Sequence, residues 1–304
     1  MLTKLVIIII FMLDLLLADP SFSYIPKIDI DNQKKYNLGK LLFFDKNLSS
    51  NKKISCSTCH NLNKGGSDQK KLSYGVDNQK SDVNSPTIFN TRFNISQDWI
   101  GYSLTIKDRT NIAFLNPKEM DGDEIKVLKY IKSNKELKDL YITVYKNFKY
   151  GDISDAIAYY VKNLNTPNSK FDKFLKGDKD ILTKQEYEGY KLFKDYGCVS
   201  CHNGINIGGN MYQKFGIFNE KDIIRDKNLG RYIVTKKEYD KYVFKVPTLR
   251  NISKTYPYMH NGEIDNLETA IKEMGKYQLG IIIQNKDIER IEIFLKTLEG
   301  DIVN

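Results

Sequence analysis

Two copies of the pattern Cys-x-x-Cys-His carry the most specific chemistry in this sequence. The residues are Cys56, Cys59 and His60 in the first copy, and Cys198, Cys201 and His202 in the second. This pattern attaches a c-type haem: two thiols form thioethers with the ring, and the adjacent imidazole binds the iron. A thioredoxin-type redox pair or half of a zinc site would also use paired cysteines. The chain has four Cys, all within these motifs, and His follows each pair directly. We therefore expect two covalently bound haem c groups and no disulfide.

The residue on the other side of each iron decides between electron transfer and catalysis. The chain has three His, so only His260 remains after the two motifs, and at most one haem can have two His ligands. Methionine is the other common ligand, and it raises the reduction potential of the haem. Spacing alone leaves Met211, Met259, Met274 and His260 open as candidates. Met274 also shares a helical face with Leu267 and Ile271, so packing in the core would explain it equally well.

Helical patterns surround both motifs. Residues 38–44 read as a short apolar helix before the first motif, and a capping box at residues 183–186 opens a helix that leads into the second. Five further amphipathic helices are expected. The first has Ile125, Leu128 and Ile131 on one face, and the others lie at 137–144, 153–164, 266–274 and 287–298. Asp152 is the expected N-cap of the helix at 153–164. The best strand signal is 242–246. The fold class is therefore mostly α, with two cytochrome c-like helical domains that each carry one covalent c-type haem.

The order of these segments predicts the domain organisation. Residues 1–23 read as a signal peptide with a lysine near its start and an apolar core, and an uncleaved anchor is the alternative. Cleavage after Ala18 and cleavage after Ser23 both fit. Residues 24–164 would form an N-terminal haem domain, 165–180 a polar linker and 181–304 a C-terminal haem domain. A leader of this kind, with c-type haem, predicts export to the periplasm.

The net charge of +9 and pI near 9.0 do not indicate a nucleic-acid partner. The lysines are spread along the chain without a dense basic run, and no nucleic-acid-binding motif is present. We interpret the charge as a general lysine-rich composition.

The order of motifs resembles the bacterial di-haem cytochrome c peroxidases, the group that includes the MauG-like enzymes. The resemblance covers nearly the whole chain after about residue 36, and it is highly specific. Besides the two haem motifs, the matching stretches are LGKLLFFD at 38–45, NSPTIFN at 84–90, NPKEM at 116–120, FKVPTLRN at 244–251, PYMHNG at 257–262 and MGKYQLG at 274–280.

The resemblance implies roles for individual residues. Met274 matches the distal ligand of the C-terminal, electron-transferring haem, opposite His202. Glu119 matches the acid/base carboxylate at the N-terminal, peroxidatic haem of His60, and Trp99 the aromatic residue between the haems. A further set matches an interface between the domains: His260 near the haem edges, and one Ca²⁺ bound by Asn84 and the carbonyl groups of Thr255 and Pro257. The resemblance also implies a calcium-dependent homodimer.

Two positions depart from the family pattern. Many members have a histidine in the loop after the first motif that caps the peroxidatic iron, and Val76 occupies its place here. Because valine cannot bind iron, we expect a first haem that needs no reductive activation. Ten residues before Glu119, where the family often has glutamine, this chain has Arg109. Its guanidinium would either stabilise charge on bound peroxide or pair with a haem propionate.

The expected activity is cytochrome-c peroxidase: reduction of hydrogen peroxide to water with electrons from a small cytochrome c or similar periplasmic donor. One alternative is a MauG-like oxidase that modifies another protein, although Met274 argues against it because that group typically has tyrosine at this ligand position. The other is a di-haem cytochrome that only transfers electrons, which the scarcity of axial ligands disfavours.

Overall fold

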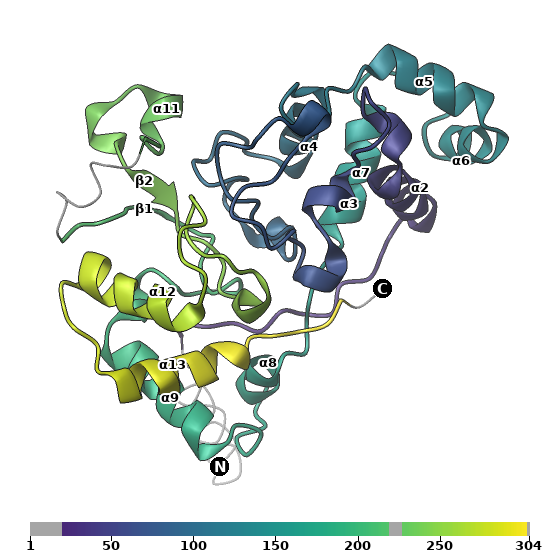
Figure 1. Cartoon of the computed structure of the whole chain (residues 1–304). Coiled ribbons are helices and arrows are strands. Elements are labelled where there is room, and N and C mark those ends of the chain that lie inside the picture. The colour runs from purple at the N-terminus through teal and green to yellow at the C-terminus, as the bar shows by residue number, and fades with distance from the viewer. Residues whose placement is uncertain (1–19, 219–226, 303–304) are drawn as a thin grey trace, which may run out of the picture.

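A computed structural model describes residues 20–218 and 227–302 of the 304-residue chain. The predicted signal peptide falls largely outside the described residues. Within them the fold is helix-rich, as expected, with one two-stranded antiparallel sheet. The helices and strands in chain order are α2 (Gln33–Phe44), α3 (Cys56–Cys59), α4 (Ile106–Leu115), α5 (Glu124–Ser133), α6 (Lys135–Tyr145), α7 (Asp152–Lys162), α8 (Lys170–Leu175), α9 (Lys184–Asp195), β1 (Tyr212–Lys214), α11 (Tyr232–Thr235), β2 (Val243–Lys245), α12 (Leu267–Met274) and α13 (Asn285–Lys296) (Figure 1).

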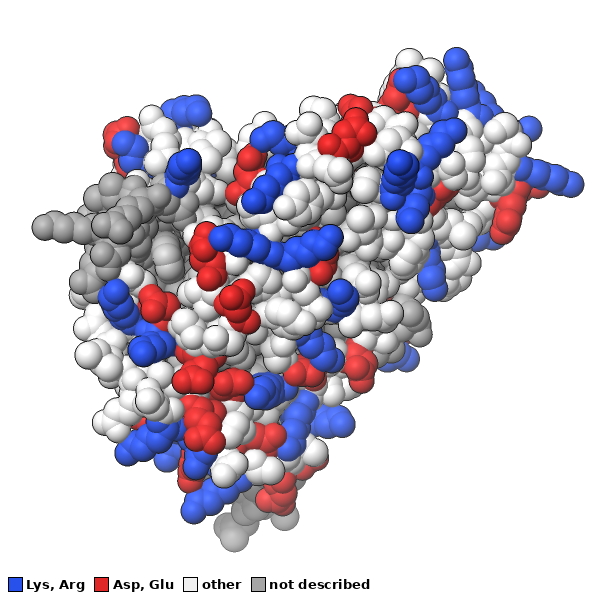
Figure 2. Space-filling model, viewed as in Figure 1, with Lys and Arg blue, Asp and Glu red and all other residues white. Residues whose placement is uncertain are grey.

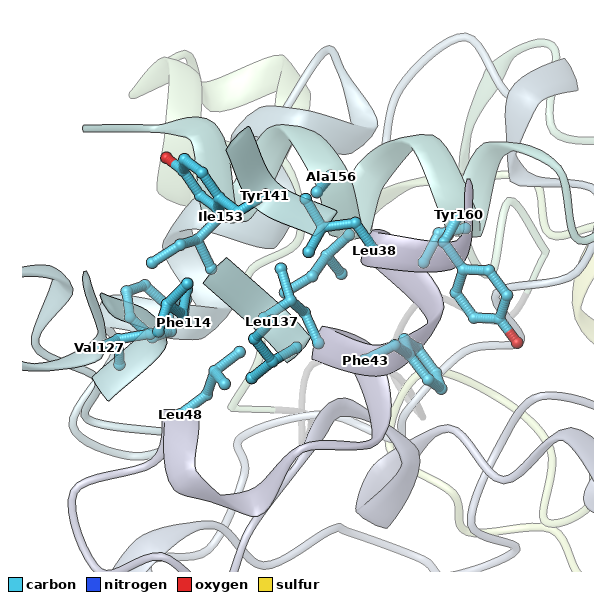
Figure 3. Close-up of a cluster of buried hydrophobic side chains, with 14 of the residues drawn as sticks. Leu38, Phe43, Leu48, Phe114, Val127, Leu137, Tyr141, Ile153, Ala156 and Tyr160 are labelled. Atoms are coloured by element: carbon cyan, nitrogen blue, oxygen red, sulfur yellow. The ribbon is translucent and has the colours of Figure 1, made fainter. Parts of the chain in front are cut away.

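Two separate hydrophobic cores organise the described chain. The first is built by α2 and α4–α7, and Figure 3 shows its side chains converging from these helices. The second is built mainly by α8, α9, α12 and α13, with a dense group of aromatic rings around Phe171 and Phe294. The helices of the first core end with α7, and those of the second begin with α8. The segment between these two helices overlaps the predicted linker at 165–180, and α8 lies inside it. The domain boundaries themselves stay a prediction.

One close helix crossing holds each core together. In the first, Gly39 of α2 lies against α7, where an added Cβ would be 2.0 Å from the carbonyl oxygen of Ala156. In the second, Gly189 of α9 lies against α13, where an added Cβ would be 1.9 Å from the carbonyl oxygen of Arg290. Only glycine permits backbones to approach so closely. Because α2 and α9 precede the two haem motifs, each motif follows a helix anchored in this way.

Most helix predictions are confirmed, including the capping box at Thr183 and the buried face of α7. Two details of these helix predictions are wrong. Ile125 is about half exposed, and Val127 takes its place in the core. Gly151, not Asp152, caps α7, and the Asp152 carboxylate accepts a hydrogen bond from the Tyr141 hydroxyl instead (2.7 Å).

The two ends of the described chain cross between the cores. Phe22 packs with the aromatic rings of the second core, although the motif that follows it belongs to the first. Ile302, near the other end, packs against the first core. No helix in residues 20–218 and 227–302 has the length and apolar character needed to span a bilayer. On the face in Figure 2, acidic and basic side chains are interspersed, which fits the interpretation of the net charge as general composition.

A buried ion pair fixes the N-terminal segment to the second core. Arg250 and Asp172 have fully buried side chains, with Nη2 2.9 Å from Oδ1. Arg250 also donates to the carbonyl oxygens of Ile205 (2.7 Å) and Ser23 (3.0 Å). Asp172 accepts a hydrogen bond from the amide of Ile25 (3.2 Å). One pair therefore joins the start of α8, the segment around residue 24 and the loop after the second haem motif.

We expect Asp172→Asn to lower the free energy of unfolding by about 3–5 kcal/mol, because it leaves the Arg250 charge buried without its partner. Denaturant unfolding of the haem-loaded protein measures the change. The control is Glu263→Gln, which breaks a pair with Lys71 whose side chains are both more than half exposed; its expected effect is about 0–1 kcal/mol. Equal effects of the two variants would contradict the prediction.

Candidate haem sites and their surroundings

The first Cys-x-x-Cys-His motif forms the short helix α3, with Ser55 before it. The amide of Ser55 donates to Thr58 Oγ1 (3.0 Å), which closes the turn between the two cysteines. Cys56 and Cys59 are free thiols, and burial raises their pKa to about 12 and about 11 respectively. Both cysteines are unpaired and adjacent in one turn of helix, as attachment of a cofactor to both would require.

The imidazole of His60 is oriented by one backbone contact. Its Nδ1 lies 3.1 Å from the carbonyl oxygen of Gly66. When Nδ1 donates its proton there, Nε2 is left with a free electron pair for a metal. Burial lowers the pKa of His60, which keeps the ring neutral as iron ligation requires. Gly66 has φ of +76° and lies against Thr87 and Phe89, so the carbonyl position depends on glycine.

Glu119 lies in a polar cluster close to the first motif. Arg109 Nη2 donates to both carboxylate oxygens (3.0 and 3.1 Å), and Asn116 Nδ2 donates to Oε1 (3.0 Å). The negative charge of Glu119 raises the pKa of the thiols of Cys56 and Cys59, so the carboxylate lies within electrostatic range of the attachment site. Nη1 of Arg109 is buried and has no hydrogen-bond partner among the described residues.

This cluster depends on α4, which the sequence analysis did not predict. Arg109 lies on α4, and Asn116 is its C-cap residue, so a single turn brings both groups to Glu119. Asn116 is a functional candidate that the sequence analysis left without a role, although it begins the quoted NPKEM stretch.

Val76 lies in the loop that packs on Glu119. Its amide donates to the backbone carbonyl oxygen of Glu119 (2.9 Å), and its side chain is 2% exposed. The preceding Gly75 is so close that an added Cβ would be 2.4 Å from the same oxygen. The structure therefore places the position expected for a capping histidine directly beside the acid/base candidate.

The second motif follows α9 through Gly197, whose φ is +83°. The amide of His202 donates to the carbonyl oxygen of Cys198 (3.0 Å), as the amide of His60 does to Cys56 (3.0 Å). Burial lowers the pKa of His202 to about 4. Its buried Nδ1 faces the carbonyl groups of Ile207 and Pro247 without a hydrogen bond of good geometry.

A cavity of about 450 Å³ adjoins the second motif. Cys198, Cys201 and His202 line it, and apolar side chains of α9, α12 and α13 form much of its wall. A group attached to both thiols would therefore enter an apolar space with a neutral imidazole beside it, which is what a haem requires. Of the four candidate distal ligands, Met259, Met274 and His260 also line this cavity, and Met211 does not. Met120, buried in the first core, instead lies with its sulfur 3.9 Å from Cys56 Sγ.

Three of the expected interface residues are joined by hydrogen bonds and ring contacts. Trp99 Nε1 donates to the carbonyl oxygen of Asn84 (2.8 Å), and the backbone amide of Asn84 donates to the carbonyl oxygen of His260 (2.8 Å). The rings of Trp99 and His260 are 6.3 Å apart, and His260 stacks on Phe244 at 4.1 Å.

The residues expected to bind calcium lie at the same place. Asn84, Thr255 and Pro257 line one cavity. The side-chain nitrogen Nδ2 of Asn84 donates to the carbonyl oxygen of Lys70 (2.9 Å), so the side-chain oxygen Oδ1 points away from that contact. Amide and carbonyl oxygens are the ligand types that Ca²⁺ prefers. Among the described residues no group of three or more His, Cys, Asp or Glu is placed to bind a metal ion.

Comparison with known proteins gives consistent matches. The model of the di-haem cytochrome c peroxidase family matches residues 33–180. The chain is 41% identical over 286 residues to cytochrome c551 peroxidase of Nitrosomonas europaea, covering 93% of this chain and 85% of that protein. It is 42% identical over 282 residues to cytochrome c peroxidase Ccp of Escherichia coli, covering 90% of this chain and 60% of that longer protein. A solved MauG-like protein associated with microbial copper homeostasis has the same fold (TM-score 0.81, 22% identity, 91% and 94% coverage).

The two motifs predict the haem content of the protein. Expression with a c-type cytochrome maturation system should give two covalent haems per chain, measured as the pyridine haemochrome after denaturation. The double variants C56A/C59A and C198A/C201A should each retain one. A double variant that retains two, or a wild type that carries one, would contradict this assignment.

Proposed function

Because the chain belongs to the di-haem cytochrome c peroxidase family, we propose that it reduces hydrogen peroxide to water with electrons from a small periplasmic cytochrome c or similar donor. The observation that carries this proposal is the carboxylate of Glu119, held by Arg109 and Asn116 within electrostatic range of Cys56 and Cys59. A carboxylate fixed beside a haem that has an open coordination position is the arrangement that peroxide cleavage needs.

Cys56, Cys59 and His60 would hold the first haem and Cys198, Cys201 and His202 the second, and the bound haems would supply the redox chemistry and a site for the peroxide. Glu119 takes the proton from the near oxygen of hydrogen peroxide and delivers it to the far oxygen, which leaves as water. Arg109 and Asn116 hold the carboxylate in one orientation, because three hydrogen bonds fix its two oxygens. Nη1 of Arg109, buried without a described partner, is available for a second anionic or polar group, either the departing oxygen or a haem propionate.

His202 and Met274 are the proposed ligands of the second haem, which stores and delivers an electron. Both line the cavity of the second motif, and methionine ligation raises the potential as that role requires. Trp99 lines the same cavity, and its ring nitrogen donates a hydrogen bond to the Asn84 carbonyl oxygen. This position supports its proposed place on the electron path between the two haems. Asn84, Thr255 and Pro257 are the proposed calcium ligands, and a calcium-dependent homodimer stays part of this proposal.

Export to the periplasm is proposed on the leader sequence and haem type. Of the two cleavage positions, the packing favours the one after Ala18. Phe22 is buried in the second core, and the Ser23 carbonyl accepts a hydrogen bond from Arg250, so cleavage after Ser23 would remove both contacts.

Two alternatives fit the site less well. A MauG-like oxidase would typically have tyrosine at the distal ligand position, where Met274 lies in the cavity here. A di-haem protein that only transfers electrons would need a sixth ligand at the first iron. Val76 occupies the family position for that ligand and is fixed beside Glu119.

We expect Glu119→Gln to lower the rate of peroxide reduction by about 10²–10⁴-fold, because it removes the proton acceptor while keeping the shape of the side chain. Steady-state oxidation of a reduced monohaem cytochrome c measures the rate. The matched control is Lys118→Gln, which changes the neighbouring residue and breaks only an exposed pair with Asp82. A loss below threefold in the Glu119 variant, with normal haem content, would refute its role.

The oxidised protein as isolated should show a high-spin ferric haem by EPR and react with peroxide without prior reduction. Val76→His should convert that haem to low spin and make the reaction depend on reduction, since it restores a ligand at this position. Val76→Ala should behave as the wild type. Two low-spin haems in the wild type would show that another residue caps the first iron.

A further inference from the structure

Lys245 is a buried cation whose position is fixed by its backbone. It ends β2, which lies between α11 and α12 in Figure 1, and pairs across the sheet with Tyr212. Its amide donates to the carbonyl oxygen of Trp99 (2.8 Å), so the residue is attached to the loop that carries the expected inter-haem tryptophan. The residue is only 7% exposed and lines the 450 Å³ cavity beside the second haem motif.

The two charged side chains that line this cavity form no ion pair with each other. Of the described residues that line it, Lys245 is the only lysine or arginine and Asp98 the only carboxylate. The carboxylate of Asp98 accepts hydrogen bonds from the amides of three residues in its own turn, which are Ile100 (3.0 Å), Tyr102 (3.1 Å) and Ser103 (3.3 Å). Asp98 is therefore committed to its turn, and Lys245 forms no ion pair with any described residue.

An ammonium group buried without a partner is energetically costly. Burial lowers the pKa of Lys245 to about 8, and the nearby charge of Asp98 acts in the opposite direction. A direct ion-pair partner for Lys245 must therefore come from whatever fills the cavity. That occupant bonds to Cys198 and Cys201, presents an apolar body to the walls, and carries an anionic group that can reach Lys245. A haem meets these conditions through its propionate carboxylates.

We propose that Lys245 forms an ion pair with a propionate of the haem attached to Cys198 and Cys201, and that its charge raises the reduction potential of that haem. The inference rests on haem attachment at the second motif, and not on peroxidase activity. Reduction lowers the positive charge at the iron by one unit, and a nearby cation stabilises the reduced form. The effect is strong because the cavity is apolar and the pair is shielded from water.

The test is a spectroscopic redox titration of the haem-loaded protein with Lys245→Met, which keeps the length of the side chain and removes its charge. We expect the equilibrium constant for reduction of the methionine-ligated haem to fall at least about tenfold, which corresponds to about 59 mV for one electron. Lys237→Met is the matched control, because it removes the same charge from an exposed position, and it should leave the potential unchanged. An unchanged potential in Lys245→Met with two haems bound would overturn the proposal.

A second variant decides the matter if Lys245→Met does not load haem. Lys245→Arg keeps the charge but changes the geometry of the pair. It should keep the potential close to that of the wild type and shift the propionate bending band in the resonance Raman spectrum of the second haem. An unshifted band would show that the propionate does not contact this residue. Peroxide turnover and haem content are measured separately. The redox titration and the Raman spectrum therefore test the ion pair even if a variant has no peroxidase activity.

Discussion

Each hydrophobic core contains a helix crossing that leaves no room for a side chain. Gly39 lies on the backbone of α7 and Gly189 on the backbone of α13. In both cases the glycine belongs to the helix that precedes a Cys-x-x-Cys-His motif. The helix that leads toward each motif is therefore fixed by a close backbone contact. The two halves thus share a design that the sequence reveals only through the repeated motif, because the crossing partners lie far from the motifs along the chain.

Between the cores, the protein relies on backbone hydrogen bonds at the edge of one cavity. Trp99, Asn84 and His260 are joined through two carbonyl groups, and Lys245 is joined to Trp99 through a third. The aromatic rings and the single lysine of the cavity wall are consequently fixed relative to one another. Such a network holds in place the groups for which we propose roles in electron transfer.

The sequence predicted the parts of the molecule that follow from local pattern. The Cys-x-x-Cys-His spacing, the face of α7 and the capping box at Thr183 all depend on residues close together in the chain. The helix α4 was missed because Phe114 is its only buried residue, so no apolar periodicity marks it. The clamp of Arg109 and Asn116 on Glu119 was missed with it. The burial of Lys245 without an ion-pair partner also could not be predicted, since the cavity around it is formed by segments distant in the sequence.

The crossing of the chain ends has a consequence for biogenesis. On the proposed export route the amino-terminal end emerges first, and Phe22 can pack only after α8 and α9, which carry the rings around it, have followed. The first core in turn receives Ile302 only when the whole chain has passed. On that route, neither core has all of its packing contacts until the polypeptide is released.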